Sequence, residues 1–324
     1  MKKISLYTIG LILTVILSAC QNDQSPPNES QSNDTEQKET NLASISNSAI
    51  YKEVDRKQID HVHGIGYPGN RNELLVATHD GPLIYHNQIW YEATTNKNDY
   101  MGFQAVADGF YSSGHPGEGS ALPNPLGLIK STDRGKTIEK LGFQGEADFH
   151  YLAVGYETNA IYAVNQQRNS EMEIGVYYSE DAKKWVDVAL KGTPNQISGL
   201  FTHPSKTNLV AITSPSGLYL SRNQGESLTR ITKEVAVSTM VFLEDRFIYA
   251  VQEPRNQLIV QSLQDGEEEE VTMPNQSLDA IDYVTVNPQN EDEVVFHTIS
   301  GSLYQTTDNG ESWTTLINER QIKK

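Results

Sequence analysis

The sequence predicts an all-β fold, and within that class a β-propeller of six four-stranded blades, with seven blades as the alternative. The first observation behind this prediction is a box of about twelve residues that recurs at roughly 40 to 48 residues, the length of one propeller blade. Well-kept copies span residues 127–138, 217–228 and 302–313. Degenerate copies lie at residues 175–185 and 81–90, and a barely recognisable copy lies near 258–266.

The second observation is the order of short apolar segments and turns within each repeat. The last repeat shows it best, with apolar segments at 281–286, 293–298, 301–306 and 313–317 and the turn sequence Asn-Pro-Gln-Asn at 287–290. Four short strands at a fixed period, separated by turn residues, are the pattern of one blade. Six such repeats fill the chain from about residue 50 onward, whereas seven blades need shorter repeats.

Each box combines a hydroxyl residue, a short acid or amide, a glycine and in some copies a tryptophan. These residues are Ser131, Asp133, Gly135, Ser179, Asp181, Trp185, Ser221, Asn223, Gly225, Thr306, Asp308, Gly310 and Trp313. The box falls between the third and fourth strands of a blade, where a carboxylate accepts backbone N–H bonds and glycine adopts positive φ. We expect the indole to pack toward the neighbouring blade. These aspartates are therefore predicted to fasten turns and not to catalyse.

These boxes resemble the Asp-box, or BNR repeat, Ser-x-Asp-x-Gly-x-x-Trp, of the sialidase and sortilin superfamily of propellers. The domain is similar to bacterial lipoproteins of that superfamily that are described loosely as glycosyl hydrolases. The blade-four copy departs from the pattern, with Asn223 in place of Asp and Leu228 in place of Trp. Sialidases of the superfamily hold a substrate carboxylate with three arginines. The arginines here lie mostly by boxes and turns, so the resemblance gives sialidase activity little support.

The N-terminus predicts export and a lipid anchor. Residues 1–20 carry Lys2 and Lys3, a short apolar run and the sequence Leu-Ser-Ala-Cys, which together are typical of a lipoprotein signal peptide with a lipobox. Cys20 is the only cysteine of the chain, so it is the expected lipidation site and no internal disulfide can form. Residues 21–48 are polar and predicted to be a disordered tether, and 49–324 the propeller. We expect a monomer attached by this lipid to the extracytoplasmic face of the cell membrane.

The formal charge of −17 limits the possible partners. A domain this acidic is not expected to bind nucleic acid, because phosphate backbones attract basic surfaces.

Histidines mark one end of the predicted propeller. His61 and His63 begin the first strand of blade one, Asp148 and His150 begin that of blade three, and His79 and His115 follow second strands, while His86, His203 and His297 are placed elsewhere. The residues at the starts of first strands and the ends of second strands share the face opposite the boxes. The period-two spacing of His61 and His63 directs both rings to one side of a strand, so His61, His63 and His150 are candidate ligands of zinc or copper. Polar lining of the channel is the alternative interpretation.

The same face supplies candidates for ligand binding and catalysis. The predicted loop at 112–125 is longer than its counterparts, and long loops in compact domains are commonly functional. His79, Tyr100, His115 and Glu118 are the predicted ligand-binding residues. A glycosidase needs two carboxylates about 5 to 10 Å apart, and Asp60, Asp108, Glu118 and Asp148 are the candidates.

Two functions remain open at this level. The first is a lipid-anchored binding propeller that takes a ligand, a metal or a partner protein at the histidine-rich mouth of its channel. The second is a glycoside hydrolase acting on extracellular glycans.

Overall fold

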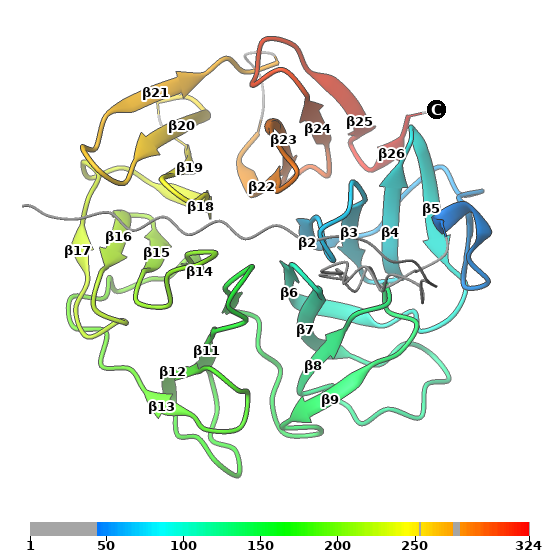
Figure 1. Ribbon diagram of the computed structural model, residues 1–324, viewed down its shortest axis with the longest axis horizontal. Helices are drawn as coiled ribbons and strands as arrows, with labels where there is room; N and C mark the ends of the chain where they lie inside the picture. The colour runs from blue at the N-terminus through cyan, green and yellow to red at the C-terminus, as the bar shows by residue number, and fades with distance from the viewer. Residues whose placement is uncertain (1–43, 253, 275–278, 324) are drawn as a thin grey trace, which may run out of the picture. The chain divides into compact units, whose positions relative to one another are not determined.

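The computed structural model describes residues 44–252, 254–274 and 279–323. The predicted signal peptide, Cys20 and most of the predicted tether lie outside these residues. The described part is a β-propeller of six antiparallel sheets arranged around a centre (Figure 1). The prediction of six blades is confirmed. Within the described residues, no helix has the length and apolar character needed to cross a membrane.

Each sheet is one blade, with strands following the chain from the innermost to the outer edge. Blade one contains β2 (Val62–Gly66), β3 (Leu74–Thr78), β4 (Gly81–His86), β5 (Ile89–Ala93) and an added outer strand, β1 (Tyr51–Glu53). Blade two contains β6 (Asp99–Val106), β7 (Gly109–His115), β8 (Leu128–Ser131) and β9 (Glu139–Gly142). Blade three contains β10 (Leu152–Val154), β11 (Ile161–Asn165), β12 (Gly175–Ser179) and β13 (Val186–Asp187).

The other three blades follow the same plan. Blade four contains β14 (Gly199–Thr202), β15 (Val210–Ser214), β16 (Gly217–Ser221) and β17 (Thr229–Arg230). Blade five contains β18 (Val237–Phe242), β19 (Arg246–Val251), β20 (Gln257–Ser262) and β21 (Glu268–Val271). Blade six contains β22 (Ile281–Asn287), β23 (Asn290–Thr298), β24 (Leu303–Thr306), β25 (Thr314–Asn318) and an added outer strand, β26 (Gln321–Ile322).

The ring closes between blade six and blade one. Innermost strands of successive blades contact one another, and β22 contacts β2. At the periphery, the N–H of Ile59 donates to Arg320 O at 2.9 Å and that of Ile322 to Lys57 O at 2.9 Å. Hydrogen bonds between segments from the two ends of the domain therefore fasten its first blade to its last.

The core is divided among the interfaces between blades. Six clusters of buried apolar side chains each join two successive blades, and one of them joins blade six to blade one. In β3, Leu74 and Val76 face blade six while Leu75 and Ala77 face blade two. Because alternate side chains of a strand point to opposite faces, both faces of this second strand must be apolar. All of its residues are buried.

Residues before position 49, the predicted start of the propeller, also pack against its blades. A short 3-10 helix, η1 (Ile45–Asn47), precedes β1, and Ile45 is 1% exposed within the cluster of blades one and two. The packed domain therefore includes residue 45, although the sequence placed residues 21–48 in the tether.

The boxes form tight turns between third and fourth strands, as predicted. In blade two, Ser131 Oγ accepts the N–H of Gly135 at 2.8 Å, and Asp133 Oδ1 accepts the N–H of Thr137 at 2.8 Å. Gly135 has a φ of 83°. The last box repeats this pattern with Thr306, Asp308 and Ser312. The Ser312 hydroxyl, followed by Thr306 and the Ser312 N–H, lowers the pKa of Asp308 to about 2.

The tryptophans of the boxes contact the preceding blade. The Trp313 indole donates to Thr272 O at 2.7 Å, and the Trp185 ring lies 5.8 Å from that of Phe143. In the blade-four box, Asn223 Oδ1 still accepts the N–H of Ser227 at 3.1 Å. The box therefore keeps its turn with an amide in place of the carboxylate.

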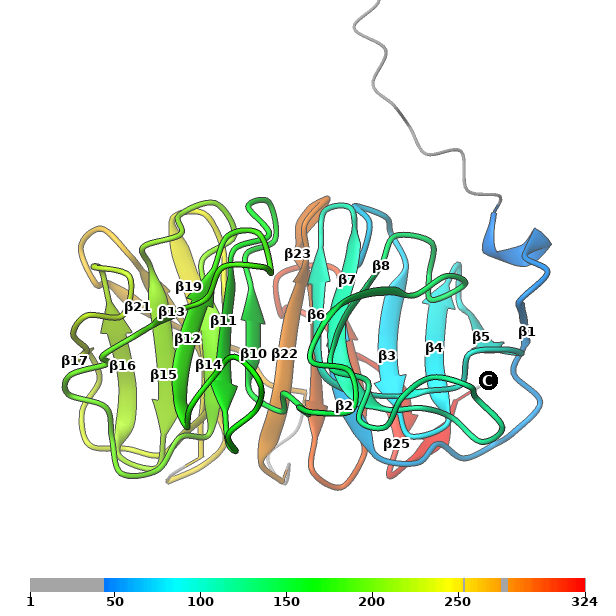
Figure 2. The ribbon, with the colours of Figure 1, turned by 90° about the horizontal axis from the view of Figure 1, so that it is seen from below.

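The strands run between two faces of the ring, as the side view shows (Figure 2). We call one the box face, because the boxes lie on it together with the turns between first and second strands. We call the other the histidine face, where the innermost strands β2, β6, β10, β14, β18 and β22 begin and the second strands end.

Candidate functional site

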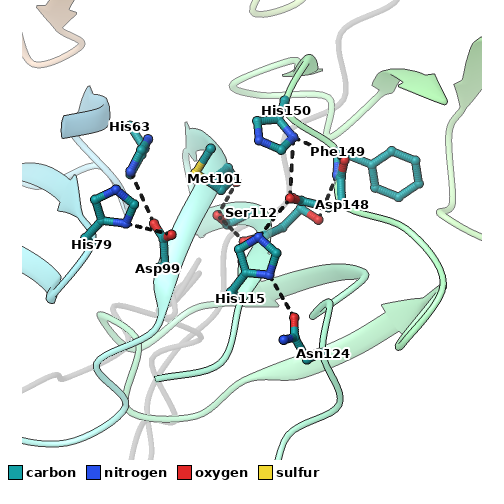
Figure 3. A network of polar contacts seen from close by, with 11 residues as sticks. His63, His79, Asp99, Met101, Ser112, His115, Asn124, Asp148, Phe149 and His150 are labelled. Atoms are coloured by element: carbon teal, nitrogen blue, oxygen red, sulfur yellow. Dashed lines mark hydrogen bonds and ion pairs between the residues drawn. The ribbon is translucent and has the colours of Figure 1, made fainter. Parts of the chain in front are cut away.

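The histidine face carries a cluster of two imidazoles around one carboxylate (Figure 3). His63 lies on β2, His79 directly follows β3, and Asp99 begins β6 of the next blade. His79 Nδ1 is 2.8 Å from Asp99 Oδ2, and His63 Nε2 is 3.3 Å from Asp99 Oδ1. The strand ends of blade one and the strand start of blade two meet at this face, so residues distant in the sequence come together.

The rings of this cluster are tightly arranged. The His63 and His79 ring centroids are 4.4 Å apart at 84°, and the exposed His61 ring meets that of His79 edge-on at 5.7 Å. Burial lowers the pKa of His63, Asp99 opposes this effect, and His79, His61 and His150 lower the pKa further by charge repulsion. These effects favour the neutral form of His63, which is the form that can coordinate a cation.

Part of this cluster is buried without a hydrogen bond. The side chains of His63 and Asp99 are both 15% exposed, and that of His79 is 41% exposed. Among the described residues, His63 Nε2 and Asp99 Oδ1 are buried atoms that have no hydrogen-bond partner. Buried polar atoms are seldom left in this state, so these two atoms are prominent candidates for contact with a bound group.

A second cluster repeats this arrangement one blade further on. His115 ends β7 and Asp148 precedes β10, and His115 Nε2 lies 3.2 Å from Asp148 Oδ2. His150 Nδ1 is 3.4 Å from the same oxygen. Asn124 Oδ1 lies 2.7 Å from His115 Nδ1. Figure 3 shows Met101 between the two clusters.

The structure places the three predicted metal ligands against different partners. His63 lies against Asp99, His150 lies against Asp148, and His61 is next to His79. Among the described residues, the one group of three or more His, Cys, Asp or Glu side chains with ligand atoms all within 4.8 Å of one another is His63, His79 and Asp99. Asp99 was absent from the sequence-based candidates, although it begins its innermost strand much as Asp148 precedes the next one.

Two of the predicted ligand-binding residues do not face the channel. Tyr100 is completely buried, and its hydroxyl accepts a hydrogen bond from Asn98 at 3.1 Å, so the role predicted for it in ligand binding is wrong. The strand β7 extends to His115, and the loop that follows lies against residues 96–98. Glu118 shares a hollow with Ile138 and Lys140 at the outer strand of blade two. It therefore lies at the rim of the propeller.

The carboxylates proposed for catalysis are dispersed. Asp108 lies in the turn between β6 and β7 on the box face, where Lys130 Nζ contacts it at 2.6 Å. Asp60 is exposed and accepts the N–H of His61 at 2.8 Å. Asp148 is held between two imidazoles.

A further histidine lies near the histidine face, although the sequence placed it elsewhere. His297 is 3% exposed near the end of β23, and its Nδ1 is 2.7 Å from Oδ1 of Asp282, close to the start of β22. Second strands end on the face where first strands begin. Applied to blade six, this rule could have predicted that His297 lies near Asp282.

The central channel contains a cavity of about 630 Å³ lined by the innermost strands of all six blades. His63 and His150 line it together with Met101, Tyr151 and Asp282. A chamber of this size is in the range of small-molecule sites. The first cluster therefore lies at a mouth that opens into the channel.

Comparisons with known proteins identify the class of fold. No protein-family model matches the chain, and no curated protein matches it. Solved structures do match: the GH74 enzyme of Niastella koreensis is 17% identical, over 82% of this chain and 47% of that one, with a TM-score of 0.54. The GH74 xyloglucanase of Xanthomonas campestris is 18% identical, over 82% and 46%, with a TM-score of 0.52.

TolB of Acinetobacter baumannii is also similar, with 13% identity over 82% of this chain and 65% of that one and a TM-score of 0.52. This chain spans about half the length of the two GH74 enzymes and about two thirds of TolB. At these identities the likeness establishes the propeller fold alone.

Proposed function

We propose that this protein is a binding propeller, held at the outer side of the cell membrane by a lipid on Cys20, that takes its ligand at the histidine-face mouth of its channel. The observation that carries the proposal is the grouping of His63, His79, His115 and His150 around Asp99 and Asp148. Functional groups converging on one mouth of a pocket are the usual mark of a binding site.

The box face supports the proposal by contrast. The polar side chains of its boxes are used within their own turns, so those boxes act as fasteners. Their hydrogen bonding and positive φ values are in keeping with membership of the Asp-box superfamily, which we propose for this domain. The sequence around Cys20 supports the lipid anchor, and the net charge of −17 is in keeping with a ligand other than nucleic acid.

Glycoside hydrolysis is the second candidate, and the folds of the GH74 enzymes are what favour it. A glycosidase requires an acid and a second carboxylate flanking the scissile bond. Of the four candidate acids, Asp108 lies on the box face, Glu118 at the outer rim and Asp60 in an exposed connection. Asp148 is already engaged by His115 and His150. This dispersal favours binding over hydrolysis.

Incubation of the full-length protein with xyloglucan and with chromogenic glycosides tests this choice. We expect no release of reducing sugar above that of an Asp148→Asn variant. Release by the unaltered protein that the variant abolishes would overturn the binding proposal in favour of the hydrolase.

The anchor is tested separately by metabolic labelling with a clickable fatty acid. We expect label on the unaltered protein and none on Cys20→Ser. Equal labelling of both would remove the lipid from the proposal without affecting the binding site.

A further inference from the structure

We propose that His63, His79 and Asp99 bind a divalent transition-metal ion, zinc or copper(II), at the mouth of the channel. This inference rests on the proposed binding function and names the ligand of that same site. The three side chains come from β2, from the end of β3 and from the start of β6. Each offers one ligand atom, and these atoms lie within 4.8 Å of one another.

The spacing of the ligand atoms fits a tetrahedral ion. Zinc bonds to imidazole nitrogen and carboxylate oxygen at about 2.0–2.2 Å, so two ligand atoms of a tetrahedral site are about 3.4 Å apart. His63 Nε2 and Asp99 Oδ1 are 3.3 Å apart. The ligand atom of His79 lies within 4.8 Å of these two atoms, so the three side chains can surround one ion.

The state of these atoms supports the same conclusion. His63 Nε2 and Asp99 Oδ1 are buried, and neither has a hydrogen-bond partner among the described residues. An ion between them replaces the missing hydrogen bonds with coordinate bonds. The two atoms face each other at 3.3 Å without a hydrogen bond, and their joint coordination of one ion would offset the desolvation cost of burying them.

The surroundings leave room for an additional ligand on the ion. His63 lines the channel cavity, and 41% of the His79 side chain is exposed. Three protein ligands with an open fourth position are the pattern of metal sites that exchange water for a ligand. The bound ion can therefore accept a group that reaches the mouth from the channel or from solvent.

The donor set selects the class of ion. Two imidazole nitrogens and one carboxylate oxygen suit zinc and copper(II), whereas calcium and magnesium prefer oxygen ligands only. In the second cluster, His115 and His150 both contact one oxygen of Asp148, and its three ligand atoms do not meet within the same distance among the described residues. The first cluster is thus the one with the geometry of a chelate.

The test is calorimetric titration of the full-length protein, purified without a histidine tag, with zinc and separately with copper(II) at neutral pH. We expect one ion per chain, and binding at least tenfold weaker in His79→Ala and in Asp99→Asn. His86→Ala is the matched control, because His86 lies at the box-face end of β4, and it should leave binding unchanged. His150→Ala is the discriminating variant: its ring lies 3.4 Å from Asp148 and outside the group of His63, His79 and Asp99, so it should weaken binding less than His79→Ala does.

Two outcomes overturn the site: an unaltered protein that binds neither ion, or binding that is lost in His150→Ala and retained in His79→Ala. The second outcome would instead favour ligation by His61, His63 and His150. Circular dichroism of each variant separates loss of binding from loss of fold, and a rise in melting temperature on adding the ion should occur only where binding is kept. A protein that binds no metal ion does not change the result of the sugar-release experiment. The metal site and the binding function can therefore be disproved independently.

Discussion

The two faces of this propeller use aspartate in opposite ways. On the box face, Asp133 and Asp308 accept hydrogen bonds from residues four positions further along the chain. On the histidine face, Asp99 and Asp148 contact imidazoles from a different blade. Asp99 Oδ1 and Asp148 Oδ1 are also left without a hydrogen-bond partner within the described residues. The box carboxylates are satisfied within their own turns, whereas each carboxylate assembled across blades keeps one buried oxygen outside any hydrogen bond in the described part of the chain.

The largest expected effect on stability comes from breaking the buried ion pair at the box of residues 127–138. Arg134 donates to both carboxylate oxygens of Glu73, at 2.6 and 2.7 Å, and both side chains are under 10% exposed. Arg134→Ala leaves the Glu73 charge buried, and we expect a loss of about 3–5 kcal/mol in the free energy of unfolding. Urea-induced unfolding followed by tryptophan fluorescence measures it.

The last box supplies the control for this variant. Asn309 has a φ of 55° where Arg134 has 61°, and its side chain is exposed. Asn309→Ala should therefore cost much less. A similar loss in both variants would show that the backbone conformation, and not the ion pair, dominates at this position.

A smaller loss should follow removal of one hydroxyl from a box. Ser131 is buried, and its Oγ accepts the N–H of Gly135 and contacts Asp133 at 3.0 Å. Ser131→Ala leaves that N–H unsatisfied, so we expect a loss of about 1–2 kcal/mol in unfolding free energy. Ser131→Thr should retain nearly full stability, because Thr306 performs this role in the last box. Equal losses in the two variants would contradict the fastening role of the hydroxyl.

The box face should also contribute a dependence on pH. His203 is completely buried, its Nδ1 accepts the N–H groups of Ser205 and Lys206, and its Nε2 donates to Glu244 O. Burial, as the first cause, lowers the pKa of His203. The unfolded chain therefore takes up this proton first, so the stabilisation is complete above about pH 6.5 and declines as the pH falls below it.

Melting temperatures between pH 7.5 and 5.5 measure this dependence. We expect His203→Asn to be less stable at neutral pH and to lose less melting temperature on acidification than the unaltered protein. His86→Ala, at a half-buried histidine on the same face, should keep the original slope. A slope unchanged by His203→Asn would assign the pH dependence to other groups.

The contrast between the faces also explains what sequence reasoning could reach. The box is a local structure, since its hydrogen bonds join residues within four positions, so its turns, its glycines and the resulting blade count could be predicted. The cluster of His63, His79 and Asp99 depends on which strand ends adjoin across two blades. Sequence spacing placed His63, His79, His115 and His150 on the histidine face but missed His297. It grouped His61, His63 and His150 as ligands because spacing does not show which way each side chain points.

Burial was the second source of error. Tyr100 follows Asp99 in the sequence, but alternate side chains of a strand take opposite sides, and Tyr100 points into the core between blades one and two. The long loop predicted at 112–125 was expected to supply ligand-binding residues, yet Gly117 donates to Asn98 Oδ1 and holds the loop against the preceding connection. The path of such a loop follows from contacts with other segments, which composition does not encode.

The smallest effect on stability is expected on the histidine face. The His115 side chain is 47% exposed beside Asp148, and polar contacts of such exposed side chains contribute only about 0.2–1 kcal/mol. His115→Ala should therefore change the urea midpoint far less than Ser131→Ala does. A larger loss than that of Ser131→Ala would mean that the imidazoles hold blades two and three together, in the way that the box residues hold their own turns. A small loss would show that stability does not require imidazoles from successive blades around shared carboxylates, which is the result that the proposed binding function predicts.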